Sequence, residues 1–268
     1  MLLVIGCTSN TARDEVTTTA QGTPSTTRLN PRDTRAADAA LDRVIRFSAR
    51  SLRDTDPFTL VLLDYLSRRF SIADLSSAHG LAQQAMANAD PKLEPELRLF
   101  QPTARPTAES LRDSSADLNS LLVRNALACD APGVAPNFEA TLIEAIRRGG
   151  YYLTHAAIAI GIQSELGCVA TGGDAVRIEI IGALEQVVRR QSQVDDLAVE
   201  RVAMLCYLGA SARVPPARIT SIVAAIASTG EPPGPDAATR RHTAALTIWA
   251  LSIVLARPET AATIVAAL

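Results

Sequence analysis

Apolar residues recur at spacings of three and four along most of this chain, and this periodicity constrains the fold more than any other feature. In one such segment Leu41, Val44, Ile45 and Leu52 fall on one side of a helix. A strand would need alternating apolar and polar residues, and the sequence has no convincing run of that kind. The sequence therefore predicts an all-α fold of about ten or eleven helices.

Capping residues, prolines and glycines mark the ends of these helices. Asp56 can cap the free N–H groups of a helix that begins at Pro57, where proline is tolerated. Gly149 and Gly150 predict a helix end, because glycine readily takes the left-handed cap conformation. The predicted helices lie at about 41–53, 57–69, 71–88, 107–129, 138–148, 153–166, 174–191, 195–208, 215–227, 236–257 and 258–268.

Two of the predicted helices are apolar on nearly every side, at about 153–166 and 243–256. Each should therefore be surrounded by other helices. Weakly similar sequences precede them, beginning at Tyr151 and at Arg240. Two inner helices flanked by amphipathic ones indicate antiparallel helix pairs, arranged either as a solenoid or as an α/α-toroid.

Composition divides the chain into parts. Residues 8–35 hold eleven Ser or Thr and almost no large apolar side chains, so we expect this segment to be disordered. The rest, 36–268, reads as a helical domain. Four prolines in 91–106 predict a linker that could subdivide this domain into 36–90 and 107–268.

The first residues suggest where the chain is held. Leu2-Leu3-Val4-Ile5-Gly6-Cys7 is an apolar run ending in a small residue and a cysteine, and a polar stretch follows at once. This pattern resembles the lipobox of bacterial lipoproteins, over about the first 30 residues. It departs from that pattern because only six residues precede Cys7 and none is basic, whereas an export signal has a basic region and a longer apolar one.

The resemblance implies that Cys7 carries a lipid, that residues 1–7 are the remnant of a signal and its lipobox, and that 8–35 form a tether. The chain would then lie in the cell envelope, anchored to a membrane. Thr8 in place of Asp implies the outer membrane if the cell is Gram-negative. The alternative is a cytoplasmic helical protein of unknown function whose cysteine at this position is accidental.

Charge and motif content exclude several functions. The net charge is −2, with 26 basic and 28 acidic residues, which does not favour nucleic acid as a partner. Lys92 is the single lysine, so chemistry that needs a lysine amine is nearly excluded. Motifs for metal ligation, for a nucleophile elbow and for nucleotide binding are missing from the sequence, and we expect neither a metal nor a cofactor. A binding or scaffolding role follows, with an envelope protein or peptide as partner.

His155 leads the weak candidates for a catalytic site. It lies in the first turn of an apolar helix beside Tyr151 and Tyr152, while Glu144 and Arg147 close the preceding helix. If the two helices fold back as a hairpin, these groups could share a pocket. A helix N-terminus lowers the pKa of a histidine, so His155 could act as a base. The alternative is that His155 is a hydrogen-bonded core residue.

An enzyme of the α/α-toroid kind, acting on envelope polysaccharide, is the alternative function. Its site would need paired carboxylates and aromatic platforms for the sugar rings, and aromatic residues are only 4% of the chain. A concave pocket that holds Tyr151, His155 and two carboxylates would favour it. His242, beside Arg240 and Arg241, is expected at a solvated helix start.

The remaining cysteines suggest one disulfide. Cys129 and Cys168 each follow a predicted helix at a loop, where a bridge is easily formed, and an oxidising envelope would allow them to pair. Cys206 lies among Met204, Leu205 and Leu208, and is expected to fill apolar space.

Overall fold

All secondary structure that we observe is helical. The computed structural model describes residues 28–87, 98, 117–130, 137–168 and 171–257, and the all-α prediction is confirmed for these residues. The described residues contain three short 3₁₀ helices, Leu52–Asp54, Ala73–Leu75 and Ser211–Arg213. They also form ten α-helices: α1 Pro31–Ser51, α2 Pro57–Phe70, α3 Ala78–Ala87, α4 Leu118–Leu127, α5 Phe138–Arg148, α6 Gly150–Glu165, α7 Gly173–Arg190, α8 Asp196–Tyr207, α9 Pro216–Ala225 and α10 Ala237–Val254.

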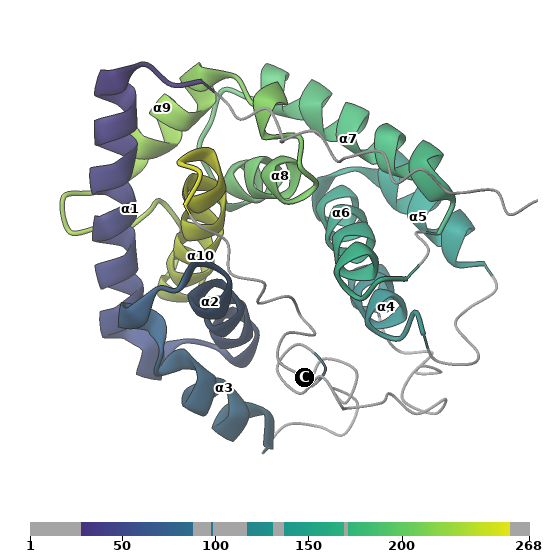
Figure 1. Cartoon of the computed structure of the whole chain (residues 1–268), viewed down its shortest axis with the longest axis horizontal. Coiled ribbons are helices and arrows are strands. Elements are labelled where there is room, and N and C mark those ends of the chain that lie inside the picture. Colours follow the sequence, from purple (N-terminus) through teal and green to yellow (C-terminus); the bar gives the residue numbers. More distant parts are fainter. Residues whose placement is uncertain (1–27, 88–97, 99–116, 131–136, 169–170, 258–268) are drawn as a thin grey trace, which may run out of the picture.

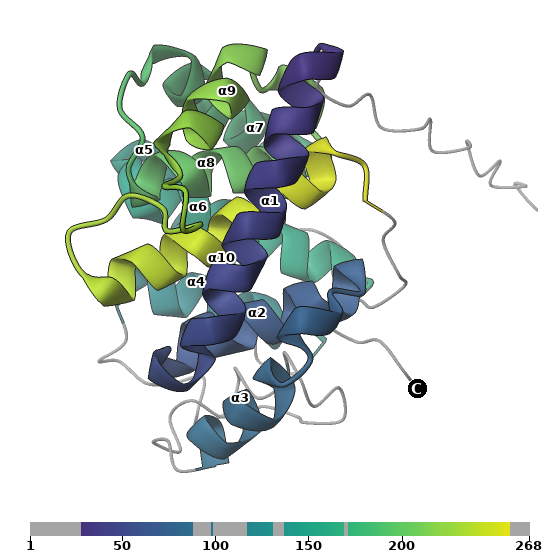
Figure 2. The ribbon, with the colours of Figure 1, turned by 90° about the vertical axis from the view of Figure 1, so that its left-hand side faces the viewer.

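The helices form two rows. The inner row follows an arc in the order α4, α6, α8, α10 and α2, and each of these helices packs against the next (Figure 1). The outer helices cover the convex side of this arc: α5 packs on α6, α7 on α6 and α8, and α1 on α10. From the side, α1 crosses α10 and α2 (Figure 2). The N-terminal helices therefore pack beside the last described helix.

Along the chain the helices alternate between outer and inner positions, from α1 outside to α10 inside. The two segments predicted to be surrounded, which became α6 and α10, are both inner helices. Antiparallel pairing and the choice between a solenoid and a toroid stay predictions. Among the described helices, none has both the length and the apolar character required to span a bilayer.

Capping residues explain several helix boundaries. The side chains of Asp56, Asp195 and Asp236 accept hydrogen bonds from the backbone N–H groups of Thr59, Ala198 and Thr239, which fixes the starts of α2, α8 and α10. α5 has the predicted bounds and ends at Gly149, whose φ is +66°.

Two local predictions were wrong. Residues 31–35, assigned to the disordered tether, are the first residues of α1, because the side chain of Asn30 caps the helix and Pro31 suits its first turn. Ser71, expected to start a helix, ends α2 with a φ of 52°, and α3 begins only at Ala78.

Several other predictions concern parts of the chain outside the described residues. These are the lipobox with Cys7, the tether up to residue 27, most of the linker 91–106, the helical stretch 107–116 and the last helix at 258–268. The subdivision into 36–90 and 107–268 stays a prediction for the same reason.

Small side chains let the inner helices approach one another closely. Ala156, Ala157 and Ala159 of α6 are fully buried, and so are Ala244, Ala245 and Ala250 of α10. Gly161 of α6 faces the ring of Tyr207 on α8, and a Cβ at this position would overlap that ring. Cys206 is buried beside it as an apolar residue, as predicted.

A disulfide joins Cys129 to Cys168, the pair that the sequence singled out, with the two Cα atoms 6.2 Å apart. It links the residues that follow α4 and α6, two neighbours of the inner row. The bond closes a loop with a sequence separation of 39. Chain-entropy models give a bond of this span roughly 3–5 kcal/mol of stabilisation.

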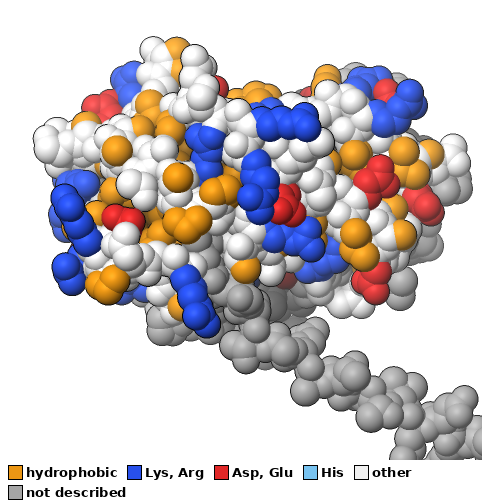
Figure 3. Space-filling view, turned by 90° about the horizontal axis from the view of Figure 1, so that it is seen from above, with side chains coloured by type: hydrophobic (Ala, Val, Ile, Leu, Met, Phe, Trp, Pro, Cys, Tyr) orange, Lys and Arg blue, Asp and Glu red, His pale blue; other side chains and the backbone are white. Residues whose placement is uncertain are grey.

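The outer face carries a mixture of side chains. On the side formed by α7, α9 and the near end of α1, arginines lie among apolar and uncharged side chains, with acidic ones also present (Figure 3). Ile178 of α7 is 65% exposed there. Such a mixture is usual for a solvent-facing layer.

Gly161 and Gly182 provide a matched pair of helix-interior glycines. Gly161→Ala should lower the free energy of unfolding by about 1–3 kcal/mol, because the new methyl group overlaps the Tyr207 ring. Gly182 has nothing within 4 Å of an added Cβ, so Gly182→Ala should instead raise it by about 0.5–1 kcal/mol through helix propensity. Urea unfolding followed by circular dichroism measures both. Equal effects would contradict the close α6–α8 approach.

Candidate functional site

All five helices of the inner row contribute to one pocket on the concave side of the arc. Its volume is about 180 Å³. A cavity of about 150 Å³ holds a benzene molecule in another protein, so a single ring with a small substituent would fit here. The lining residues are Phe58, Val61, Leu62 and Tyr65 of α2, Val123 of α4, His155, Ile158 and Ile162 of α6, Glu200 and Tyr207 of α8, and His242, Leu246 and Trp249 of α10.

The walls are mostly apolar and partly aromatic. Trp249 packs on Tyr207 with ring centroids 4.6 Å apart, and on Tyr65 edge-to-face at 5.5 Å. Phe58 is 55% exposed although it lines the pocket. The buried indole N–H of Trp249 has no acceptor among the described residues. The pocket therefore offers a large apolar contact area with few polar groups.

At one end of this aromatic group, the polar side chains are paired with one another. Tyr65 donates a hydrogen bond of 2.6 Å to Oε1 of Glu165, and Arg69 forms an ion pair with the same carboxylate. The guanidinium of Arg69 also lies 5.6 Å from the centroid of the Tyr207 ring. Because the charges of Arg69 and Glu165 cancel, this end has no unsatisfied charge.

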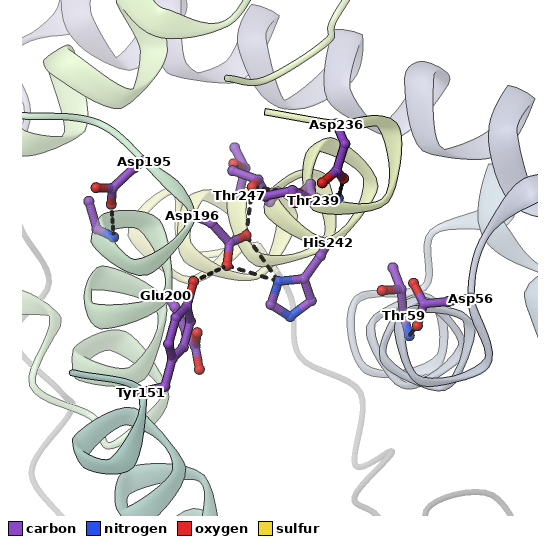
Figure 4. Close-up of polar contacts among 12 residues, drawn as sticks. Asp56, Thr59, Tyr151, Asp195, Asp196, Glu200, Asp236, Thr239, His242 and Thr247 are labelled. Atoms are coloured by element: carbon purple, nitrogen blue, oxygen red, sulfur yellow. Dashed lines mark hydrogen bonds and ion pairs between the residues drawn. The ribbon is translucent and has the colours of Figure 1, made fainter. Parts of the chain in front are cut away.

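Asp196 organises the polar groups at the other end, where it ties α8 to α6 and α10 (Figure 4). Its carboxylate accepts hydrogen bonds from the hydroxyl of Tyr151 at 3.0 Å and from that of Thr243 at 2.6 Å. Nδ1 of His242 lies 2.9 Å from Oδ1 of Asp196, while the second ring nitrogen points away from this carboxylate. Asp196 is the first residue of α8, where the helix dipole favours a negative charge.

Asp196 and His242 form an ion pair that stabilises the charged form of each. Burial alone would raise the pKa of Asp196, but its hydrogen bonds and the charge of His242 outweigh burial and lower the pKa. Burial alone would lower the pKa of His242, but Asp196 outweighs that effect and raises it. The pair is therefore ionised on both sides between the lowered pKa of the carboxyl and the raised pKa of the imidazole.

Glu200, one helical turn after Asp196, is in a very different state. Its side chain is 2% exposed, and its Oε2 atom has no hydrogen-bond partner among the described residues. Burial raises the pKa of Glu200 to about 7, against the smaller lowering effects of Thr154 and His242. Glu200 thus changes charge near neutral pH while it lines an apolar pocket.

His155 lies beside Glu200, with its Nδ1 atom 3.8 Å from Oε1 of that residue. The same Nδ1 lies 2.8 Å from the backbone carbonyl of Tyr151, which can only accept, so Nδ1 carries the proton. Burial lowers the pKa of His155. The neutral imidazole then presents Nε2 as a hydrogen-bond acceptor.

The structure brings some of the candidate residues together and not others. Tyr151 and His155 lie with Asp196 and Glu200, but Glu144 forms ion pairs with Arg147 and Arg148 away from the pocket, on the exposed side of α5. Tyr152 is stacked by Arg148, 5.4 Å from its ring centroid. The hairpin hypothesis therefore fails for Glu144, Arg147 and Tyr152. Those three residues lie on α5 or on the side of α6 that faces it.

Sequence reasoning missed the partner of His242 and two carboxylates. His242 lies near the start of α10 with its side chain 38% exposed, as expected, but it also lines the pocket and pairs with Asp196, 46 residues away in the chain. In the sequence, Asp196 looks like part of a helix cap, and Glu200 looks like a polar residue on the exposed side of an amphipathic helix. Glu200 could have been identified because α8 is apolar on every side, so a charged residue in its middle has to be buried.

Within the described ranges, no group of three or more His, Cys, Asp or Glu side chains has the geometry to hold a metal ion. Comparison of the chain with protein-family models, with curated proteins and with solved structures gives no match.

Glu200→Gln tests the state of the buried carboxyl. Because the pKa in the folded chain, about 7, exceeds the ordinary value of 4.5, the proton stabilises the fold fully below pH 4.5. That contribution is lost as the pH rises through 7, at a cost of about 3 kcal/mol for the charged form. The amide avoids this cost, so the variant should be more stable than wild type at pH 8 and about equal to it at pH 4.5.

The matched control is Glu185→Gln. Glu185 is partly exposed, and hydrogen bonds from Arg189 and Arg213 lower its pKa, so the amide should give no gain at pH 8. Urea unfolding at both pH values measures the difference. Parallel pH profiles for wild type and Glu200→Gln would show that Glu200 does not titrate in this range.

Proposed function

We propose that the helical domain binds a small, largely apolar molecule in the pocket of the inner row, and that a lipid on Cys7 holds the domain at the cell envelope. The first part rests on one observation: five helices converge on a single apolar pocket. A concave pocket with an apolar and aromatic lining and a few polar groups is typical of small-molecule sites.

The size of the pocket favours a small ligand over a peptide. A volume of about 180 Å³ accommodates roughly one ring, not a series of side chains. The aromatic walls supply contact area, and the few polar groups lie near the ends of the pocket, as in many small-molecule sites. The expected envelope protein or peptide partner remains a separate proposal, without support from this pocket.

The envelope location rests on two independent features. The lipobox-like sequence ending in Cys7 lies outside the described residues, and it supports lipid attachment through its pattern alone. The Cys129–Cys168 disulfide supports an oxidising compartment, because such bonds are rare where thiols are kept reduced. The cytoplasmic alternative would leave this disulfide without a suitable environment.

A second candidate is an enzyme that acts on envelope polysaccharide. It is favoured by the gathering of Tyr151, His155, Asp196 and Glu200, the constellation that such a site needs. Against it stands the lining, since sugar hydroxyls require many hydrogen-bonding partners and most residues of this pocket are apolar. We therefore rank it second.

Trp249, the single tryptophan of the chain, reports directly on the pocket that it lines. Titration of the full chain with toluene should change the Trp249 fluorescence in a saturable way, because toluene would replace empty space against the indole. N-acetylglucosamine should cause no saturable change. A response to the sugar but not to toluene would overturn the proposal in favour of the polysaccharide enzyme.

A filled pocket provides the control for this titration. Val61→Phe should abolish the saturable response, because Val61 is a buried lining residue and the larger ring would occupy the pocket. Ile178→Phe introduces the same side chain on the exposed surface of α7 and should leave the response unchanged. Binding that survives Val61→Phe would place toluene elsewhere.

Intact mass spectrometry tests the location. Protein purified without reductant from the membranes of a bacterial host should lack residues 1–6, carry acyl mass on Cys7, and be two hydrogens lighter because Cys129 and Cys168 are joined. Cys7→Ser should remove the acyl mass and the cleavage but keep the disulfide. Retention of Met1 with no acyl mass would support the cytoplasmic alternative.

A further inference from the structure

The polar end of the pocket contains a buried acidic side chain, Glu200, and the apolar walls do not explain its presence there. Glu200 lines the pocket with a 2% exposed side chain, and its Oε2 atom has no partner in the described part of the chain. An unpaired buried carboxylate is far more costly than an unpaired neutral group such as the N–H of Trp249. A ligand that brings a positive charge to this carboxylate would reduce this cost.

The charges around Glu200 favour a cation. Asp196 and His242 neutralise each other as an ion pair, and burial lowers the pKa of His155 and favours its neutral form, although the hydrogen bond to the carbonyl of Tyr151 acts in the opposite direction. Arg201, next to Glu200 in the chain, donates to the neutral amide of Gln191 and keeps its positive charge, which has a smaller effect on Glu200 than burial has. Among the described residues, the ionised carboxylate of Glu200 therefore has no direct cationic partner at its Oε2 atom.

The other helices around the pocket add to the negative potential. Asp56 caps α2 and acts on His242 through its charge, and Asp117 caps α4 and acts on His155 in the same way. His155 in its neutral form presents an acceptor nitrogen. The polar end thus combines negative charge with acceptor atoms, which suits a ligand group that is positively charged and donates hydrogen bonds.

We propose that the pocket selects a small apolar amine, whose ammonium group pairs with the Glu200 carboxylate while its apolar body packs against Trp249, Ile158 and Leu246. The inference rests on the proposed binding function and deepens it. The ammonium pairs with the Glu200 carboxylate, and the Asp196–His242 pair keeps its own charge balance. An anionic ligand of the same size would meet an unpaired carboxylate and be rejected.

Benzylamine, benzyl alcohol, toluene and benzoate share one ring and differ in the polar group, so they isolate the charge. Trp249 fluorescence titrations of the full chain at pH 8 should give a benzylamine affinity about tenfold or more above that of toluene or benzyl alcohol, since a hydrogen bond to a charged group is a strong one. Benzoate should bind most weakly.

Glu200→Gln should remove the preference for benzylamine and leave toluene binding within about twofold, because the amide keeps the shape and loses the charge. Glu185→Gln, which removes a carboxylate from the outer helix α7, should leave the whole series unchanged. The thermal melting of each variant, followed by circular dichroism, establishes that it is folded before its affinities are compared.

The outcomes separate this inference from the proposed function. Toluene binding without a preference for benzylamine, or a preference that persists in Glu200→Gln, would overturn the amine inference and leave the apolar pocket standing. Absence of binding by every member of the series would overturn both. Tightest binding by benzoate would show that the polar end carries positive charge and prefers anions, and it would overturn the amine inference.

Discussion

The inner helices are covered by other helices on nearly every side, and they can approach one another closely only where their side chains are small. This packing constraint determines how the inner row is assembled. In α6 and α10, alanine and glycine lie at the contacts with α8, so the three helix backbones come close together. Gly161 leaves room for the ring of Tyr207 at the contact between α6 and α8. Tyr207 packs on Trp249 of α10, and both rings form walls of the pocket on the concave side. The pocket is thus a consequence of the close packing around it.

Sequence reasoning predicted the helices better than their assembly. Helix starts depend on local contacts, such as Asp56 with the N–H of Thr59, and these can be recognised from a few neighbouring residues. Ser71 shows the limit even at this level, since a serine that could start a helix ends one in a left-handed conformation. The order of the inner row could not be derived, because α2 and α10 are neighbours in space while they lie at opposite ends of the described chain.

The site was harder to predict for the same reason. His155 and Tyr151 were found because they stand together in the sequence, at the start of an apolar helix. Their partners come from elsewhere: Asp196 lies 45 residues from Tyr151 and 46 from His242. A carboxylate at a helix start is expected as a cap, and Asp195 next to it does cap α8, so Asp196 carried no separate signal. Only the fold distinguishes an exposed aspartate from one that accepts three hydrogen bonds inside the protein.

Asp196 and Glu200 also illustrate how environment gives two similar groups different roles. Asp196 has its partners within the protein, so it is ionised and contributes to the packing of three helices. Glu200 has one carboxylate oxygen without such a partner, and it loses its proton only near neutral pH. A fully satisfied network rigidifies a core, whereas an unsatisfied buried acid weakens it unless something else pairs with it. The Asp196 network stabilises the helix ends around Glu200, while the disulfide joins the opposite end of α6 to α4. The fold can therefore tolerate the cost of one unpaired carboxyl in the position where a bound molecule would compensate it.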